Sequence, residues 1–198
     1  MPVTLVLASA SRARAEMLRA AGVAIEIAPA RIDEAAVKSA MLAEQAPPRD
    51  IADTLAELKA IRVSAGRPGL VLGADQVLVS EAGMLDKPAD AAAARAQLAG
   101  LRGQTHRLLS AAVIAEAGQP VWRHVGAARL TMRPFSDAFL DRYLAEAGPA
   151  VLESVGAYHL EGLGAQLFSA VEGDYFTVLG LPLLAVLGFL RARGELVE

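Results

Sequence analysis

Apolar residues gather in short runs that alternate with amphipathic stretches along the chain. Five of these runs predict β-strands, at residues 3–7, 24–27, 70–79, 107–114 and 121–132. Helical patterns lie between them, and this alternation is typical of the α/β class. Turn-forming residues at 116–120 predict an antiparallel hairpin between the last two strands, so we expect a mixed sheet.

Each predicted helix has recognisable end signals. Serine at an N-cap accepts a hydrogen bond from a free helix amide, glycine suits the position after the last turn, and proline suits the first turn. The expected boundaries are Ser11 and Gly22 for the first helix, Pro47 and Pro48 before the second, Ser136 and Gly148 around another, and Pro182 in the first turn of the last.

Composition narrows the function classes. At 198 residues the chain is long enough for a single domain, 1–198, or for two lobes around a cleft within it. A net charge of −3 gives no basic surface for nucleic acid, so we expect no such partner. Cysteine is absent, which excludes disulfides and thiolate chemistry and fits a reducing cytoplasm.

Neither apolar terminus predicts a membrane segment. The N-terminal run is short and its arginines follow it, so we interpret it as a strand and not as a signal peptide. The C-terminal run, 176–190, is shorter than the roughly 20 residues that span a bilayer and contains Pro182 and Gly188. We therefore expect a buried final helix, no membrane partner and a cytoplasmic location.

Asp75 interrupts the apolar run at 70–79. An unpaired ionised carboxylate taken out of water costs several kcal/mol, so an acid there needs a cation, a metal or a raised pKa. The run alone leaves two interpretations open. Asp75 is either a functional carboxylate or a turn residue where two short strands meet at Gly73.

Hydroxyl and guanidinium groups crowd the first strand–helix connection, at Ser9, Ser11, Arg12 and Arg14. Helix amides, the helix dipole and arginines together make an anion site. The alternative is that Ser11 is only an N-cap and the arginines are exposed to solvent. The glycines of a Walker loop or a dinucleotide fingerprint are missing.

Lysine is rare in this chain. Of 19 lysines and arginines, only Lys38, Lys59 and Lys87 are lysine. A compact ammonium is preferred to a broad guanidinium beside a phosphate or a metal-bound oxygen. Lys59 lies on the helical stretch before the Asp75 strand and Lys87 in a turn soon after it, so both could converge on one cleft.

Glu34 follows the second predicted strand and precedes a helical stretch. Two carboxylates, Glu34 and Asp75, with several cations are the ingredients of Mg²⁺-dependent phosphoryl chemistry. Alternatively, Asp33 or Glu34 is a helix cap. The histidines lack metal-ligand spacing and are expected to be structural: His106, His124 and His159.

Taken together, these segments resemble the Maf family of nucleoside triphosphate pyrophosphatases along nearly the whole chain. The specificity of the match lies in the order of its motifs. They are 7–11 with Arg14, Asp33-Glu34, Lys59, 73–76, Lys87-Pro88, 103–106, 156–164, 172–174 and 180–183.

The resemblance implies an elongated α/β fold with a central cleft, similar to inosine triphosphate pyrophosphatases. It also implies hydrolysis between the α and β phosphorus atoms of a nucleoside triphosphate with a divalent metal, Mg²⁺ or Mn²⁺, as house-cleaning of the nucleotide pool. The implied roles are Asp75 as catalytic proton acceptor, Glu34 as metal or water partner, both as metal ligands, and Ser9, Arg14, Lys59 and Lys87 as phosphate-binding residues. Whether Asp75 acts as base, metal ligand or both stays open.

Three positions matching the family's specificity positions are Ala13, Gln76 and Glu161. The dTTP and UTP branch carries arginine, threonine and glutamine there, whereas the 7-methyl-GTP branch carries tryptophan, glutamine and glutamate. Gln76 and Glu161 follow the second branch and Ala13 follows neither. A carboxylate can accept from the N–H donors of a guanine edge and would repel uracil carbonyls, so we expect a purine or modified-purine substrate.

Other functions remain compatible with the sequence. The chain could be a dTTP and UTP pyrophosphatase, or a nucleotide-binding regulator of septum formation and cell division with little turnover. An apolar surface left by the sheet or the last helix could also support a homodimer.

Overall fold

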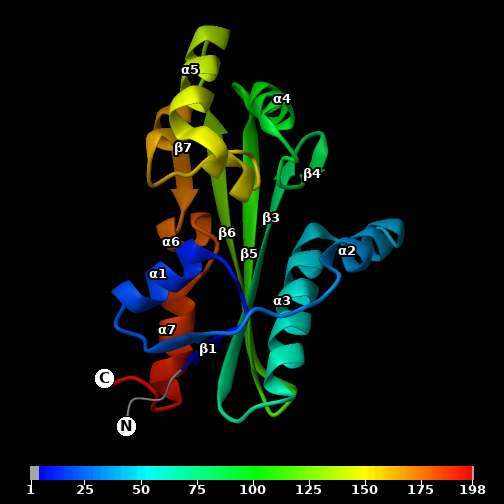
Figure 1. Cartoon of the computed structure of the whole chain (residues 1–198), viewed down its shortest axis with the longest axis vertical. Coiled ribbons are helices and arrows are strands. Elements are labelled where there is room, and N and C mark those ends of the chain that lie inside the picture. The colour runs from blue at the N-terminus through cyan, green and yellow to red at the C-terminus, as the bar shows by residue number, and fades with distance from the viewer. Residues whose placement is uncertain (1–4, 198) are drawn as a thin grey trace. The chain divides into compact units, whose positions relative to one another are not determined.

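The computed structural model of the protein describes residues 5–197 and has helices around a mixed β-sheet (Figure 1). The strand order is β2-β1-β3-β5-β6-β7, with β4 paired to β3. The strands are β1 (Leu5–Leu7), β2 (Ile25–Ile27), β3 (Leu70–Ser80), β4 (Gly83–Leu85), β5 (Thr105–Glu116), β6 (Gln119–Met132) and β7 (Phe168–Gly173). The expected α/β class and all five predicted strands are confirmed, except that Val3 and Thr4 lie outside the described residues.

Helices occupy most of the predicted helical stretches. They are α1 (Arg12–Ala20), α2 (Glu34–Ala43), α3 (Pro48–Ser64), α4 (Ala91–Leu101), α5 (Asp137–Ala147), α6 (Tyr175–Val178) and α7 (Leu183–Ala192), with 3₁₀ helices η1 (Gly148–Glu153) and η2 (Leu163–Leu167). Ser11 caps α1 and Ser136 caps α5 as expected. Pro182 is the N-cap of α7 and not part of its first turn, because the helix begins at Leu183.

The chain forms two compact units. The first unit contains Met1–Gln76, Leu109–Gly126 and Asp174–Glu198, and the second contains Val77–Leu108 and Ala127–Gly173. Strands β3, β5 and β6 contribute residues to both units. The elongated shape and the central cleft implied by the family resemblance stay predictions.

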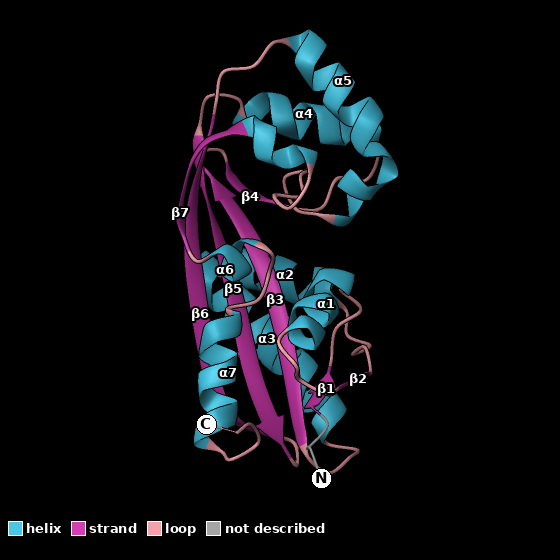
Figure 2. Ribbon diagram, turned by 90° about the vertical axis from the view of Figure 1, so that its left-hand side faces the viewer, coloured by secondary structure: helices cyan, strands magenta, loops and turns pink. Residues whose placement is uncertain are grey.

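Two helical layers enclose the sheet of the first unit. β1 pairs in parallel with β2 and with β3. One core cluster joins Leu72 of β3 to Leu18 of α1 and Val186 of α7, whereas Val71 packs with Val63 of α3. Figures 1 and 2 accordingly show α3 on one face of the strands and α1 and α7 on the other. Because side chains alternate along a strand, successive β3 residues face different helices.

β3 is one uninterrupted strand through Gly73, so the alternative of two short strands meeting there is wrong. Gly73 is instead a point of close packing. A Cβ at this position would overlap the carbonyl oxygen of Ala56 and lie 2.6 Å from the amide nitrogen of Ala60. Only glycine lets the α3 backbone approach β3 this closely.

The second unit contains the two strands that the sequence patterns did not predict. β4 pairs antiparallel with β3, and β7 pairs antiparallel with β6. Its core includes an aromatic group in which His106 packs against Tyr158 and Phe168, with ring centroids 5.6 and 6.0 Å away.

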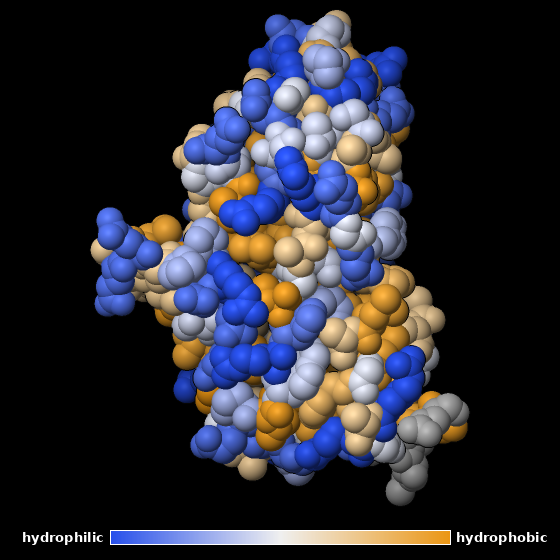
Figure 3. Space-filling model, turned by 180° about the vertical axis from the view of Figure 1, so that it is seen from behind, coloured by the Kyte–Doolittle hydropathy of each residue, from blue (hydrophilic) through white to orange (hydrophobic). Residues whose placement is uncertain are grey.

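The surface is mixed in character. In Figure 3, hydrophobic patches lie between hydrophilic side chains on the face shown. Among residues 5–197, no helix is both long enough and apolar enough to cross a bilayer. Homodimer formation stays a prediction.

Candidate functional site

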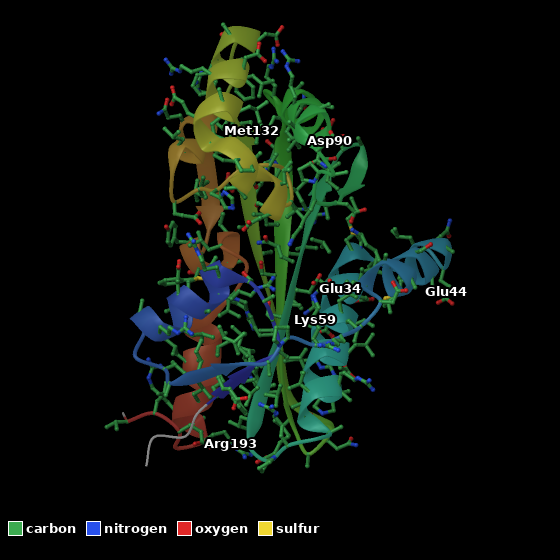
Figure 4. All side chains as sticks on the ribbon, in the orientation of Figure 1. Glu34, Glu44, Lys59, Asp90, Met132 and Arg193 are labelled. Atoms are coloured by element: carbon green, nitrogen blue, oxygen red, sulfur yellow. The ribbon has the colours of Figure 1, made fainter. Side chains whose placement is uncertain are left out.

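Asp75, Lys59 and Glu34 form a compact ionic cluster in the first unit. Lys59 Nζ lies 2.7 Å from Asp75 Oδ1 and 2.9 Å from Glu34 Oε2. Lys59 is 6% exposed and Asp75 8%. Figure 4 shows Lys59 on α3 beside Glu34 at the start of α2. We call these three residues the carboxylate–lysine cluster; with all three groups ionised its net charge is −1.

Local packing explains why this cluster forms. Val71, Gly73 and Asp75 alternate onto the face of β3 that α3 covers. The close contact at Gly73 brings the α3 backbone against β3, next to the helical turn that carries Lys59. The buried ammonium and the buried carboxylate therefore compensate each other, which removes most of the cost of burying either alone.

Asp33 and Glu34 have different tasks. Asp33 caps α2, its Oδ1 accepting a 3.0 Å hydrogen bond from the Ala36 amide. The capping alternative therefore holds for Asp33. Glu34, the first residue of α2, uses its carboxylate for Lys59.

Arg14 forms the second part of the site. Its Nε donates to Gly180 O at 2.8 Å, and its Nη1 donates to Ala74 O at 3.0 Å and Ser9 Oγ at 3.1 Å. Burial lowers the pKa of Arg14, against the attraction of Asp75 and Glu34. All of its hydrogen-bond partners are neutral, and it makes no ion pair within residues 5–197. A largely desolvated cation of this kind favours an anionic ligand.

The end of β1 adds polar groups beside Arg14. Ser9 is buried, and its Oγ also accepts a 3.2 Å hydrogen bond from the Ser11 amide. Ser11 is the N-cap of α1, so the N-cap interpretation holds and does not exclude an anion site at the same helix terminus. The connection from β1 continues through α1 to β2, whereas β3 lies on the other side of β1. Ligands of α/β proteins bind at such topological switch points.

The structure brings only some of the predicted site residues together. Ser9, Glu34, Lys59, Asp75 and Arg14 all belong to the first unit. Ala13 also lies there, half-buried in the first turn of α1. Gln76 belongs to the first unit as well. Lys87 and Glu161 are instead exposed residues of the second unit, and their roles stay predictions.

Gln76 has partners that the sequence did not suggest. Its Nε2 lies within hydrogen-bonding distance of Ser110 Oγ and the backbone carbonyls of Thr177 and Val178. Ser110 is a completely buried polar residue in the apolar β5 run. Like Asp75, Ser110 is a polar residue within an apolar run, and this is the sequence signal by which it could have been found.

The donor chemistry of the carboxylate–lysine cluster fits a hard divalent cation. Asp75 and Glu34 place carboxylate oxygens 2.7 and 2.9 Å from Lys59 Nζ, and Mg²⁺ is commonly held by one or two carboxylates together with waters and substrate phosphates. No group of three or more histidine, aspartate and glutamate side chains suited to a metal occurs within residues 5–197. A metal here would therefore need oxygens from the ligand as well.

The mixed sheet, the carboxylate–lysine cluster and Arg14, which makes no ion pair in the described part of the chain, define an α/β protein with a site suited to an anionic ligand. The chain belongs to the Maf family, because the family model described as "Maf-like protein" matches residues 4–193. The family resemblance found in the sequence is thereby confirmed.

Several relatives carry the name nucleoside triphosphate pyrophosphatase. The protein of Paramagnetospirillum magneticum is 60% identical over 192 residues, covering 96% of this chain and 99% of its own. The protein of Caulobacter vibrioides is 55% identical over 195 residues, covering 98% and 97%. That of Roseobacter denitrificans is 56% identical over 197 residues, covering 99% of both chains.

Proposed function

We propose that this Maf-family chain is a nucleoside triphosphate pyrophosphatase, a hydrolase that converts a nucleoside triphosphate to the monophosphate and pyrophosphate. The names of its relatives support this activity. The observation that carries the proposal is that an arginine with only neutral hydrogen-bond partners in the described residues and a cluster with net negative charge both contact β3. Arg14 donates to Ala74 O and makes no ion pair within residues 5–197, whereas Asp75, the next residue of β3, belongs to a cluster with net negative charge.

In this proposal some residues bind the triphosphate and another accepts a proton from the attacking water. A triphosphate needs cations to hold it and to neutralise charge that develops during attack at phosphorus. Arg14 supplies a guanidinium whose Nη2 makes no hydrogen bond to the described residues, and Ser9 supplies a hydroxyl beside it. Lys59 fixes Asp75 Oδ1, which leaves Oδ2 to accept a proton from the attacking water.

A divalent cation completes this proposal. Mg²⁺ or Mn²⁺ bound by Asp75 and Glu34 would neutralise phosphate charge and polarise the reacting phosphorus. Lys87 is carried over from the family resemblance as a further phosphate-binding residue. These assignments rest on the donor chemistry of the side chains and on the family resemblance.

Within this activity we favour a purine or N7-methylated purine as the base. Glu161 supports the preference, because its carboxylate can accept from the paired N–H donors of guanine. Ala13 provides no aromatic ring for stacking. Preferential cleavage of dTTP and UTP in a substrate panel would overturn this choice of base without affecting the proposed reaction.

Pyrophosphate release from canonical, methylated and deaminated nucleoside triphosphates tests the proposal. We expect turnover with Mg²⁺ or Mn²⁺, loss of turnover with chelator, and a reduction of about 100-fold or more in Asp75→Asn. Asp50→Asn, an exposed change in the first turn of α3, is the matched control and should retain activity. Near wild-type turnover in Asp75→Asn would refute the assignment, and tight nucleotide binding without turnover would favour a regulator of septum formation and cell division.

A further inference from the structure

A polar junction crosses the interior of the first unit between β3, β5 and α6. Gln76 Nε2 lies 2.9 Å from Ser110 Oγ, 3.1 Å from Thr177 O and 3.0 Å from Val178 O. Ser110 Oγ in turn donates to Thr177 O at 2.7 Å. Both backbone carbonyls can only accept, which fixes the amide nitrogen of Gln76 toward them. Its two N–H groups are therefore already used within the protein.

Further contacts hold α6 in the same place. Asp174 Oδ2 accepts hydrogen bonds from the amide and the hydroxyl of Thr177, each at 2.9 Å. On β6, a Cβ at Gly126 would lie 2.6 Å from Thr177 Oγ1. The absence of a side chain at Gly126 lets α6 approach the strand closely, so residues of three strands position this short helix.

The backbone that follows α6 holds Arg14. Gly180 O accepts the 2.8 Å hydrogen bond from Arg14 Nε, and Gly180 has φ +101°, a left-handed conformation that favours glycine. A Cβ at Gly180 would lie 3.5 Å from Arg14 Nε and Nη2 and 3.8 Å from Gln76 Oε1. Gln76 and Arg14 therefore border the same glycine.

We propose that Gln76 and Ser110 are positioning residues for Arg14, and that Gln76 influences the triphosphate end of the substrate rather than reading its base. The proposal rests on the proposed function, in which Arg14 binds phosphate. Gln76 and Ser110 hold the Thr177 and Val178 carbonyls, which places Gly180 O. Gly180 O and Ala74 O then orient the guanidinium.

Two substitutions separate positioning from base reading. Gln76→Glu keeps the shape of the side chain but places a carboxylate oxygen against the backbone carbonyl oxygens of Thr177 and Val178, which cannot donate, so the α6 contact becomes repulsive. Ser110→Ala removes one donor and is the milder change. Gln119→Glu, an exposed position at the start of β6, is the matched control.

Inorganic tripolyphosphate is the probe because it has no base. By calorimetry, we expect its Kd to rise about tenfold or more in Gln76→Glu, and in the same direction in Ser110→Ala. NMR should show faster exchange of the Arg14 Nε proton with water in both variants. The KM values for all nucleoside triphosphates should rise by a common factor, and Gln119→Glu should match wild type in each measurement.

The outcomes distinguish this inference from the proposed function. Absence of pyrophosphate release by the wild-type protein would refute the function, whereas tripolyphosphate binding and proton exchange need no turnover. An unchanged tripolyphosphate Kd with an altered ranking of bases in Gln76→Glu would overturn the inference in favour of base reading. Failure of the wild-type protein to bind tripolyphosphate would also overturn it. If Gln76→Glu does not fold, the Ser110→Ala measurements decide.

Discussion

His106 should make the protein less stable in mild acid. Its Nε2 lies 2.7 Å from Tyr158 Oη, and its Nδ1 is buried without a hydrogen-bond partner within residues 5–197. Burial lowers the pKa of His106 to about 4. The ring is therefore neutral in the folded protein at pH values where an unfolded chain already protonates its histidines.

The sign and size of the effect follow from proton linkage. The unfolded pKa of histidine is about 6.5, so the stabilising difference is fully present above pH 6.5 and is lost as the pH falls toward 4. At about 1.36 kcal/mol per pH unit, the loss approaches about 3 kcal/mol at pH 4 and is about 2 kcal/mol at pH 5.

Urea unfolding at pH 8 and pH 5 measures this loss. His106→Gln keeps a polar group near Tyr158 but cannot titrate, so its free energy of unfolding should fall by about 2 kcal/mol less than that of wild type between the two pH values. The exposed His124→Gln variant is the control and should follow wild type. If wild type and His106→Gln lose the same free energy, the histidine explanation is wrong, whatever their absolute stabilities.

Two glycines should respond oppositely to alanine. Gly73→Ala should lower the free energy of unfolding by about 1–3 kcal/mol, because its Cβ overlaps Ala56 O. Urea titration measures this effect against the control Gly66→Ala, where a Cβ meets nothing within 4 Å. Equal stability of the two variants would contradict the prediction. Gly100→Ala in α4 should raise the free energy of unfolding by about 0.5–1 kcal/mol, because alanine favours the helix more than glycine and a Cβ there meets nothing within 4 Å. Thermal unfolding checks this, and a lower Tm would contradict the prediction.

Much of the fold was predictable because its long strands are buried. β3 and β5 consist mainly of apolar residues, and these runs stand out from their surroundings. β7 is mostly exposed and β4 has three residues, so neither carries a pattern that burial imposes. These short strands depend on pairing with β6 and β3, which is information that a local sequence pattern lacks.

The site was predictable only where a side chain was unusual for its surroundings. Asp75 was visible as an acid in an apolar run, and Lys59 as a rare lysine. The partners of Gln76 were not visible, because the carbonyls of Thr177 and Val178 come from 101 and 102 positions away. Backbone carbonyls have no residue-specific signal, so sequence could identify the charged groups but not what orients them.

Three successive residues of β3, 74–76, contact different parts of the site. The Asp75 side chain bonds Lys59 of α3, whereas that of Gln76 bonds the carbonyls of α6. The backbone carbonyl of Ala74, the residue before Asp75, accepts a hydrogen bond from Arg14. A register shift of one residue would turn each side chain to the opposite face of the sheet. It would take the Asp75 carboxylate away from Lys59 and the Gln76 amide away from the α6 carbonyls.

This arrangement gives the two cations different surroundings. Lys59 has two carboxylate partners, so it neutralises only part of their charge. The acceptors of Arg14 among residues 5–197 are all neutral, so its charge remains available. A bound anion complements Arg14 and a bound cation complements the carboxylate–lysine cluster. A metal-bound triphosphate would provide both charges in one ligand, which is why we expect metal and triphosphate to bind more tightly together than either does alone.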